Sequence, residues 1–191
     1  MVFCVRQNQK VIFEKNFYAL KTLYIHGLDS FPVPEKIEIL KKSGLDVIAP
    51  HLDYRTQTDV YPIVKSLAIE NRVEFVIGSS LGGYVSFWLA EDLGIPCLLY
   101  NPAMTYQRLF GKYLPPIPHR LCPERYVVIG AMDETVNPIK NRRFFQKQDT
   151  TSCHQRVIVC EWLPHQIDFK TFEETVCWAL KCHQLMTGKT N

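Results

Sequence analysis

One serine stands between two glycines at the point where a short apolar run ends and an amphipathic run begins. Residues 75–77 are aromatic and β-branched, which is typical of a buried parallel strand, and the apolar residues after Ser80 recur at helical spacing. The pattern predicts a strand that turns sharply into a helix at Ser80. In such a turn, a nucleophile elbow, the serine backbone is strained and the residues two before and two after it must be small. Gly78 and Gly82 meet that requirement.

The adjacent Ser79 is a poorer candidate for this role, because Ile77 and Leu81 would occupy the positions that must be small. The first N–H groups of the helix after Ser80 would point at the turn, where they could bind a developing oxyanion. An alternative interpretation of the same glycines is a left-handed turn or a loop that cradles phosphate.

Strands and helices alternate over nearly the whole chain. Apolar runs predict strands at 22–25, 46–49, 75–77, 97–100, 125–130 and 157–161, and helical patterns predict helices at 34–42, from about 59, from 81 to about 93, from 138 and from about 168. This alternation predicts a three-layer α/β fold, in which helices cover both faces of a mostly parallel sheet. No linker divides the 191 residues, so we expect a single domain over 1–191.

The composition is that of an ordinary globular protein. Hydrophobic residues make up 47% of the chain, and a net charge of +3 is too small to favour a nucleic-acid partner. The basic cluster fits a solvated helix face formed by Lys140, Arg142, Arg143 and Lys147. Seven cysteines without a C-x-x-C pair or a secretory signal indicate reduced thiols and a cytoplasmic protein. No stretch reaches the roughly 20 apolar residues of a membrane span, so we expect no membrane partner.

Polar residues follow several of the predicted strands directly. The segment 26–28 follows the first strand, Ser80 the third, Asp133 the fifth and His165 the last. The carboxyl ends of parallel strands meet at one edge of a sheet, where ligands bind in open α/β folds. The chain order of serine, aspartate and histidine is that of a hydrolase triad.

These residue types can carry out nucleophilic catalysis together. A serine hydroxyl attacks a carbonyl only when a base removes its proton, so we expect His165 to accept the proton of Ser80 and Asp133 to orient the imidazole. Backbone N–H groups of Leu81 and Leu28 would bind the oxyanion. These roles require no metal and no cofactor.

Each assignment has a structural alternative. Asp133 could be a turn residue ahead of a helix, with Glu134 as the nearest substitute for the acid, and His165 could lie in a surface loop. His51 also follows a strand, but it precedes the serine in the chain, so we expect a structural or pocket-lining role for it. His26 is expected to brace a loop.

Two stretches depart from the alternation of strands and helices. Residues 1–20 hold two short apolar pieces, which fit an edge hairpin or an N-terminal extension. Residues 101–123 are rich in proline, which excludes a long regular element. We expect this Pro-rich excursion to line the site, with one helical turn near 105–110, so that Tyr106 and Tyr113 contact substrate together with Gly27. The alternative is a surface loop without function.

Four blocks of sequence carry a resemblance to a known family. They are Tyr24-Ile25-His26-Gly27-Leu28-Asp29-Ser30, Gly78-Ser79-Ser80-Leu81-Gly82-Gly83-Tyr84, Tyr100-Asn101-Pro102-Ala103 and Asp133-Glu134-Thr135-Val136. Over residues 21–182 the chain resembles the YqiA-like (UPF0227) family of small bacterial α/β-hydrolase esterases. The block around the serine and the Asn-Pro-Ala block are the most specific parts of the match.

The resemblance implies a compact α/β-hydrolase fold without a large cap domain, with esterase activity on short acyl esters. It places the nucleophile at Ser80, the acid at Asp133 and the base at His165. The sequence departs from the family pattern at two places. Glycine usually precedes the acid and the histidine, whereas Met132 and the pair 163–164 stand there in this chain.

The leading hypothesis is a serine esterase that cleaves small carboxylic esters or thioesters through an acyl-enzyme. A serine peptidase or amidase could use the same triad, and a catalytically idle binding protein could keep the same fold. The expected partner is a small-molecule ester, and the chain could also form a homodimer.

Overall fold

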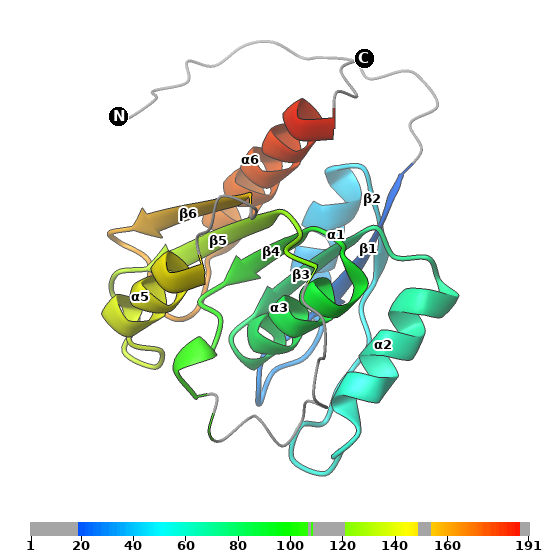
Figure 1. The fold of residues 1–191 in the computed structure, drawn as a ribbon, viewed down its shortest axis with the longest axis horizontal. Helices are drawn as coiled ribbons and strands as arrows, with labels where there is room; N and C mark the ends of the chain where they lie inside the picture. Colours follow the sequence, from blue (N-terminus) through cyan, green and yellow to red (C-terminus); the bar gives the residue numbers. More distant parts are fainter. Residues whose placement is uncertain (1–18, 107, 109–120, 149–153, 188–191) are drawn as a thin grey trace.

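The computed structural model describes residues 19–106, 108, 121–148 and 154–187. Six strands in these ranges form one parallel sheet in the order β2-β1-β3-β4-β5-β6. They are β1 Leu20–Ile25, β2 Leu45–Ile48, β3 Phe75–Ser79, β4 Cys97–Tyr100, β5 Arg125–Gly130 and β6 Gln155–Cys160. The strand that precedes Ser80, β3, therefore lies inside the sheet between β1 and β4 (Figure 1).

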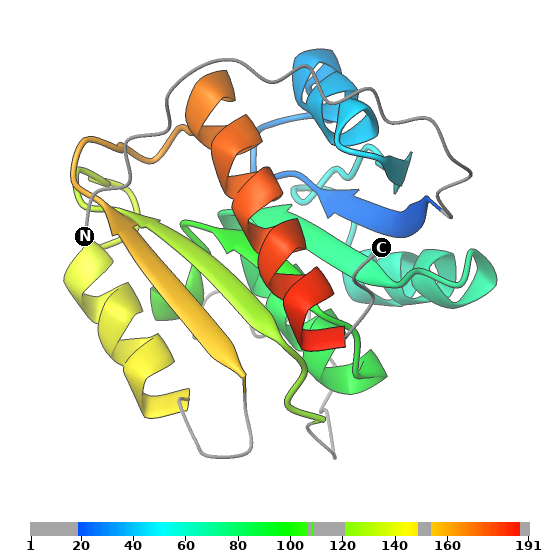
Figure 2. The ribbon, with the colours of Figure 1, turned by 90° about the horizontal axis from the view of Figure 1, so that it is seen from above.

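Helices cover both faces of the sheet, as the alternation predicts. The helices are α1 Pro34–Lys42, α2 Val60–Glu70, α3 Leu81–Leu93, α5 Pro138–Gln148 and α6 Phe169–Thr187, and a 3-10 turn, η1 Met104–Tyr106, follows β4. Helices α1 and α6 pack together on one face, and α2, α3 and α5 pack on the other (Figure 2). This is a three-layer α/β arrangement.

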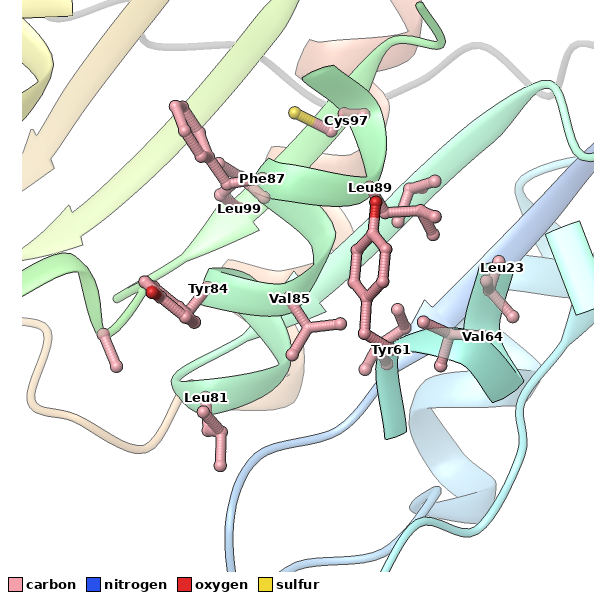
Figure 3. Close-up of a cluster of buried hydrophobic side chains, with 14 of the residues drawn as sticks. Leu23, Tyr61, Val64, Leu81, Tyr84, Val85, Phe87, Leu89, Cys97 and Leu99 are labelled. Atoms are coloured by element: carbon pink, nitrogen blue, oxygen red, sulfur yellow. The ribbon is translucent and has the colours of Figure 1, made fainter. Parts of the chain in front are cut away.

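The core consists of two apolar layers, one on each face of the sheet. On β1, Leu23 and Ile25 point into the layer beneath α2 and α3, while Tyr24 points into the layer beneath α1 and α6. Figure 3 shows the first layer, where side chains from α2 and α3 meet those of the strands. Because both faces are covered, the central strands carry runs of consecutive apolar residues, such as Leu23–Ile25, Phe75–Ile77 and Tyr126–Ile129, rather than apolar residues at alternate positions.

The boundaries of most elements agree with the predictions. The helix at 34–42 and the strands at 97–100 and 125–130 have the predicted limits. Strand β6 begins at Gln155 instead of residue 157, because Gln155 pairs with Arg125 in the β5–β6 ladder although neither residue is apolar. The hydrophobic pattern thus identifies only the apolar part of a strand.

Surface features follow the composition. The cluster of Lys140, Arg142, Arg143 and Lys147 is exposed on α5, which confirms the solvated helix face.

The cysteines of the described ranges have free thiols, and they are Cys97, Cys122, Cys160, Cys177 and Cys182. Among the described helices, none is both long enough and apolar enough to cross a membrane. The predicted hairpin or extension at 1–20 lies almost wholly outside the described residues.

A buried ion pair joins α3, the helix that follows Ser80, to the sheet. The guanidinium of Arg125, at the start of β5, donates to the carboxylate of Glu91 on α3, and both side chains are almost fully buried. The guanidinium carbon also lies 5.1 Å from the centre of the Phe87 ring. Removing one partner of such a pair leaves the other charge buried without compensation.

We therefore expect Glu91→Gln to lower the free energy of unfolding by about 3–5 kcal/mol. The control is Glu38→Gln, which removes one partner of the exposed Glu38–Lys42 pair within α1 and should cost no more than about 0.5 kcal/mol. Denaturant unfolding followed by circular dichroism measures both values. Equal losses in the two variants would contradict this account.

Candidate active site

The backbone turns sharply at Ser80, between β3 and α3. Ser80 has φ 55° and ψ −121°, a conformation that residues other than glycine rarely adopt. Its N–H donates to the carbonyl oxygen of Tyr100 at 2.9 Å, and its own carbonyl accepts from Ala103 N–H at 2.9 Å. The strained turn expected from the glycine pattern is therefore present, and β4 and the segment after it hold it in place.

The two glycines of the turn are required for steric reasons. A Cβ atom at Gly82 would lie 2.2 Å from the carbonyl oxygen of His26, and one at Gly78 would lie 2.2 Å from Ser86 Oγ and 2.5 Å from the Gly82 carbonyl oxygen. Backbone atoms of the loop after β1 and of α3 occupy the space that a side chain would need. The segment 26–28 can therefore approach Ser80 closely.

The structure brings Ser80, His165 and Asp133 together at the carboxyl edge of the sheet. Ser80 Oγ lies 3.0 Å from His165 Nε2, and His165 Nδ1 lies 2.8 Å from Asp133 Oδ2. A carboxylate only accepts hydrogen bonds, so Nδ1 carries the proton and Nε2 of the neutral ring can accept from the serine hydroxyl. The Asp133 side chain is 1% exposed and that of His165 is 20% exposed, so the aspartate is shielded while the histidine can be reached.

Asp133 is both a turn residue and the partner of the histidine. Its Oδ1 accepts the N–H groups of Thr135 and Val136 at 2.8 Å each, which leaves Oδ2 for His165. The predicted substitute, Glu134, has an exposed side chain. The turn therefore fixes the carboxylate that faces the imidazole.

The two loops that depart from the family's glycine pattern pack directly against each other. Met132 N–H donates to the Leu163 carbonyl oxygen at 3.1 Å. The Leu163 side chain is fully buried, whereas that of Met132 is 61% exposed. Side chains larger than glycine fit at these two positions, because Leu163 points into the core and Met132 points into solvent.

The groups expected to bind an oxyanion lie beside the serine. Leu81 opens α3, so its N–H has no acceptor within the helix. On the other side, a Cβ atom at Gly27 would lie 3.0 Å from Ser80 Cβ and 3.6 Å from Ser80 Oγ. The Gly27–Leu28 peptide is therefore adjacent to the hydroxyl, and the missing side chain of Gly27 leaves room there.

His26 braces this loop, as expected from the sequence. Its ring is buried, Nε2 accepts the N–H of Leu52 at 2.9 Å, and Nδ1 donates to the carbonyl oxygen of Gly27 at 2.8 Å. Because that carbonyl points at the imidazole, the N–H of Leu28 in the same trans peptide points the opposite way. Burial lowers the pKa of His26, and the nearby His51, stacked on it at 5.6 Å, lowers it further.

A cavity of about 340 Å³ adjoins the triad on the side of Asp133. Every residue that lines it has a polar side chain: Thr105, Tyr106, Asp133, Glu134, Thr135, Asn137 and Lys140. Tyr106, predicted to contact substrate, lies in η1 and donates its hydroxyl proton to the Thr135 carbonyl oxygen at 2.6 Å. Tyr113 and most of the Pro-rich excursion lie outside the described residues.

One polar residue at this edge received no role in the sequence analysis. Asn101 follows β4 as Ser80 follows β3, and its side chain contacts the loops that carry the acid and the histidine. The rule that functional residues follow parallel strands would have selected it. In the described ranges, no group of three or more His, Cys, Asp or Glu side chains is arranged to hold a metal ion.

The environment of His26 predicts a pH dependence of stability. Because burial lowers its pKa in the folded state, the unfolded chain takes up a proton first on acidification, below about pH 6.5, and folding is then disfavoured. Above that pH, His26→Asn should lower the free energy of unfolding by about 1 kcal/mol, because the hydrogen bond from Leu52 N–H to His26 Nε2 is lost. Below about pH 6.5, the free energy of unfolding of wild type should fall relative to that of His26→Asn by up to about 1.4 kcal/mol per pH unit, because only wild type carries this histidine. Urea unfolding of both proteins between about pH 8 and 5 measures these free energies. A difference between wild type and His26→Asn that does not change with pH would contradict the lowered pKa of His26.

Comparison with known proteins places the chain in a family. The model of the uncharacterised protein family UPF0227 matches residues 21–184. A monoacylglycerol lipase from Paleococcus ferrophilus superposes with a TM-score of 0.65 at 17% sequence identity, and the match covers 85% of this chain and 94% of that chain.

Two further structures give the same result. An esterase from Pyrococcus furiosus has a TM-score of 0.65 at 18% identity, covering 86% of this chain and 82% of that chain. A protein of the alpha/beta hydrolase superfamily from Xanthomonas campestris has a TM-score of 0.66 at 15% identity, covering 85% and 97%. The chain has the α/β-hydrolase fold and belongs to the UPF0227 family.

Proposed function

We propose that this protein is a serine esterase that cleaves small carboxylic esters or thioesters through an acyl-enzyme on Ser80. The observation that carries the proposal is the pair of contacts that link Ser80 Oγ to His165 Nε2 at 3.0 Å and His165 Nδ1 to Asp133 Oδ2 at 2.8 Å. The fold shared with an esterase and a lipase supports the same reaction class.

In the first half of the reaction, His165 Nε2 accepts the proton of Ser80 while Oγ forms a bond to the carbonyl carbon. The N–H groups of Leu81 and Leu28 bind the resulting oxyanion, and the Asp133 carboxylate stabilises the imidazolium. The bond to the leaving alcohol or thiol then breaks, and His165 donates the proton to it. The product of this half is the acyl-enzyme and the free alcohol or thiol.

The second half repeats these steps with water. His165 removes a proton from the attacking water, the oxyanion forms again at the same two N–H groups, and Ser80 leaves with the proton that His165 returns. The carboxylic acid is released and the triad is restored. Ser80, His165 and Asp133 are sufficient for each of these proton transfers.

The cavity that borders Asp133 is polar, and it meets the triad at the acid only, because neither Ser80 nor His165 lines it. Its volume of about 340 Å³ and its polar lining suit a hydrophilic acyl or alcohol group better than a long hydrocarbon chain. Lys140 and Glu134 lie at this cavity with opposite charges, so a group that carries both donors and acceptors would be accommodated. We propose short, polar esters as the preferred substrates.

Hydrolysis of a panel of p-nitrophenyl esters and thioesters, of varied chain length and polarity, tests the proposal. We expect Ser80→Ala to lower kcat/KM by more than about a thousandfold. The matched control is Ser79→Ala, because Ser79 is the adjacent serine and its hydroxyl is bonded to Tyr24 rather than to His165. That variant should keep activity within about tenfold of wild type.

Other outcomes assign other functions. If wild type and Ser80→Ala hydrolyse every ester at the same rate, the esterase proposal is wrong, and if a folded wild type hydrolyses none of them above background, a catalytically idle binding protein is favoured. Cleavage of amides at rates comparable to those of esters would assign a peptidase or amidase instead. A cytoplasmic location and a homodimer stay predictions.

A further inference from the structure

We propose that Asn101 is a positioning residue that sets the histidine and the acid against each other and against the serine. This inference rests on the proposed function, because it concerns how the same three side chains are held. The role of Asn101 is to hold the loops that carry Asp133 and His165, and Asn101 itself does not touch the substrate.

The Asn101 side chain joins two loops that are distant in the sequence. Its Oδ1 accepts the N–H of Gly130 at 2.7 Å, and its Nδ2 donates to the carbonyl oxygens of Pro164 and His165 at 3.0 and 3.1 Å. The residue is 1% exposed. Both N–H groups and the oxygen of one amide are therefore used, and a buried amide satisfied in this way holds its partners firmly.

On the acid side, the contact acts through Gly130. Gly130 ends β5, and its carbonyl oxygen accepts the N–H of Asp133 at 3.3 Å. A Cβ atom at Gly130 would lie 2.2 Å from the Leu163 carbonyl oxygen, so the acid loop and the histidine loop are in backbone contact at this point. The amide of Asn101 spans the junction between them.

On the histidine side, the contact is direct. The carbonyl oxygen that Asn101 binds belongs to His165 itself, and the neighbouring one belongs to Pro164. Fixing two successive carbonyls fixes the peptide plane between them and limits where the imidazole can lie. The separation of His165 Nδ1 from Asp133 therefore depends on one side chain that touches both loops.

The same segment also holds the serine. Tyr100, just before Asn101, and Ala103, two residues after it, bind both backbone groups of Ser80: the Tyr100 carbonyl accepts the Ser80 N–H and the Ala103 N–H donates to the Ser80 carbonyl, each at 2.9 Å. Segment 100–103 is thus bonded to the serine directly, to the histidine directly, and to the acid through Gly130. In the part of the chain that the structure describes, we find no other segment with bonds to all of these backbones.

Asparagine suits this position for two reasons. The residue has φ 40°, in the left-handed region that asparagine tolerates better than most residues. Its amide offers two donors and one acceptor within a short side chain. An aspartate would keep the acceptor but turn a carboxylate oxygen toward two carbonyl oxygens.

The test compares Asn101→Gly with Asn141→Ala. Glycine removes the amide and accepts the positive φ without strain. Asn141 is the matched control, because it is also 1% exposed but its amide atoms have no hydrogen-bond partner. We expect Asn101→Gly to lower kcat by about tenfold to a hundredfold with KM within about twofold of wild type, since misplaced groups slow the chemical step. Asn141→Ala should keep the wild-type kcat.

A second readout separates positioning from general loosening. The low-field proton resonance of His165 Nδ1–H, assigned by its absence from His165→Gln, should be present in wild type and Asn141→Ala and lost in Asn101→Gly. If kcat falls while the resonance persists, or if both stay as in wild type, the proposal is wrong. A wild-type protein without hydrolytic activity would refute the proposed function, whereas the resonance would still test the role of Asn101.

If Asn101→Gly does not fold, Asn101→Asp serves in its place. That variant keeps the shape and the acceptor for Gly130 N–H, but it loses the two donated bonds and turns a carboxylate oxygen toward the carbonyl oxygens of Pro164 and His165. The same loss of kcat and of the resonance is expected, and retention of either one would overturn the proposal.

Discussion

The whole site depends on how closely two backbone segments approach each other at the turn after β3. The carbonyl oxygens of Ile25 and His26 would lie only 2.3 and 2.2 Å from a Cβ atom at Gly82, so the loop after β1 rests on the first turn of α3. That approach brings the Gly27–Leu28 peptide beside the hydroxyl of Ser80. Because all the strands run parallel, the acid and histidine loops reach the same edge from β5 and β6.

Side chains that bond to backbone groups hold this edge together. His26 binds the loop after β1, Asn101 binds the loops after β5 and β6, and Asp133 caps the turn that carries it. Each is buried, so each bond lies in an environment where an unpaired polar group is costly. Bonds of this kind restrict where the loops can lie, and a preorganised oxyanion site and a general base both require such restriction.

The sequence allowed the fold and the triad to be predicted for identifiable reasons. Pro34 starts α1 at its first position, the apolar runs mark buried strands, and the rule that ligands bind at the carboxyl ends of parallel strands selects Ser80, Asp133 and His165. The contacts of Asn101 could not be predicted, because they join residues about 30 and 60 positions away through loop conformations that no local pattern determines. The hydrophobic pattern does not predict the start of β6, because Gln155 and Arg156 belong to the ladder although both are polar.

The central claim is that Ser80 is an activated nucleophile, and its most direct test is covalent labelling of the folded protein with a fluorophosphonate, followed by peptide mass spectrometry. The account predicts one phosphonylated residue, Ser80, with labelling that slows sharply in His165→Gln although that variant remains folded. A folded wild-type protein that stays unlabelled, or that is labelled at another residue at the same rate in both proteins, would contradict it.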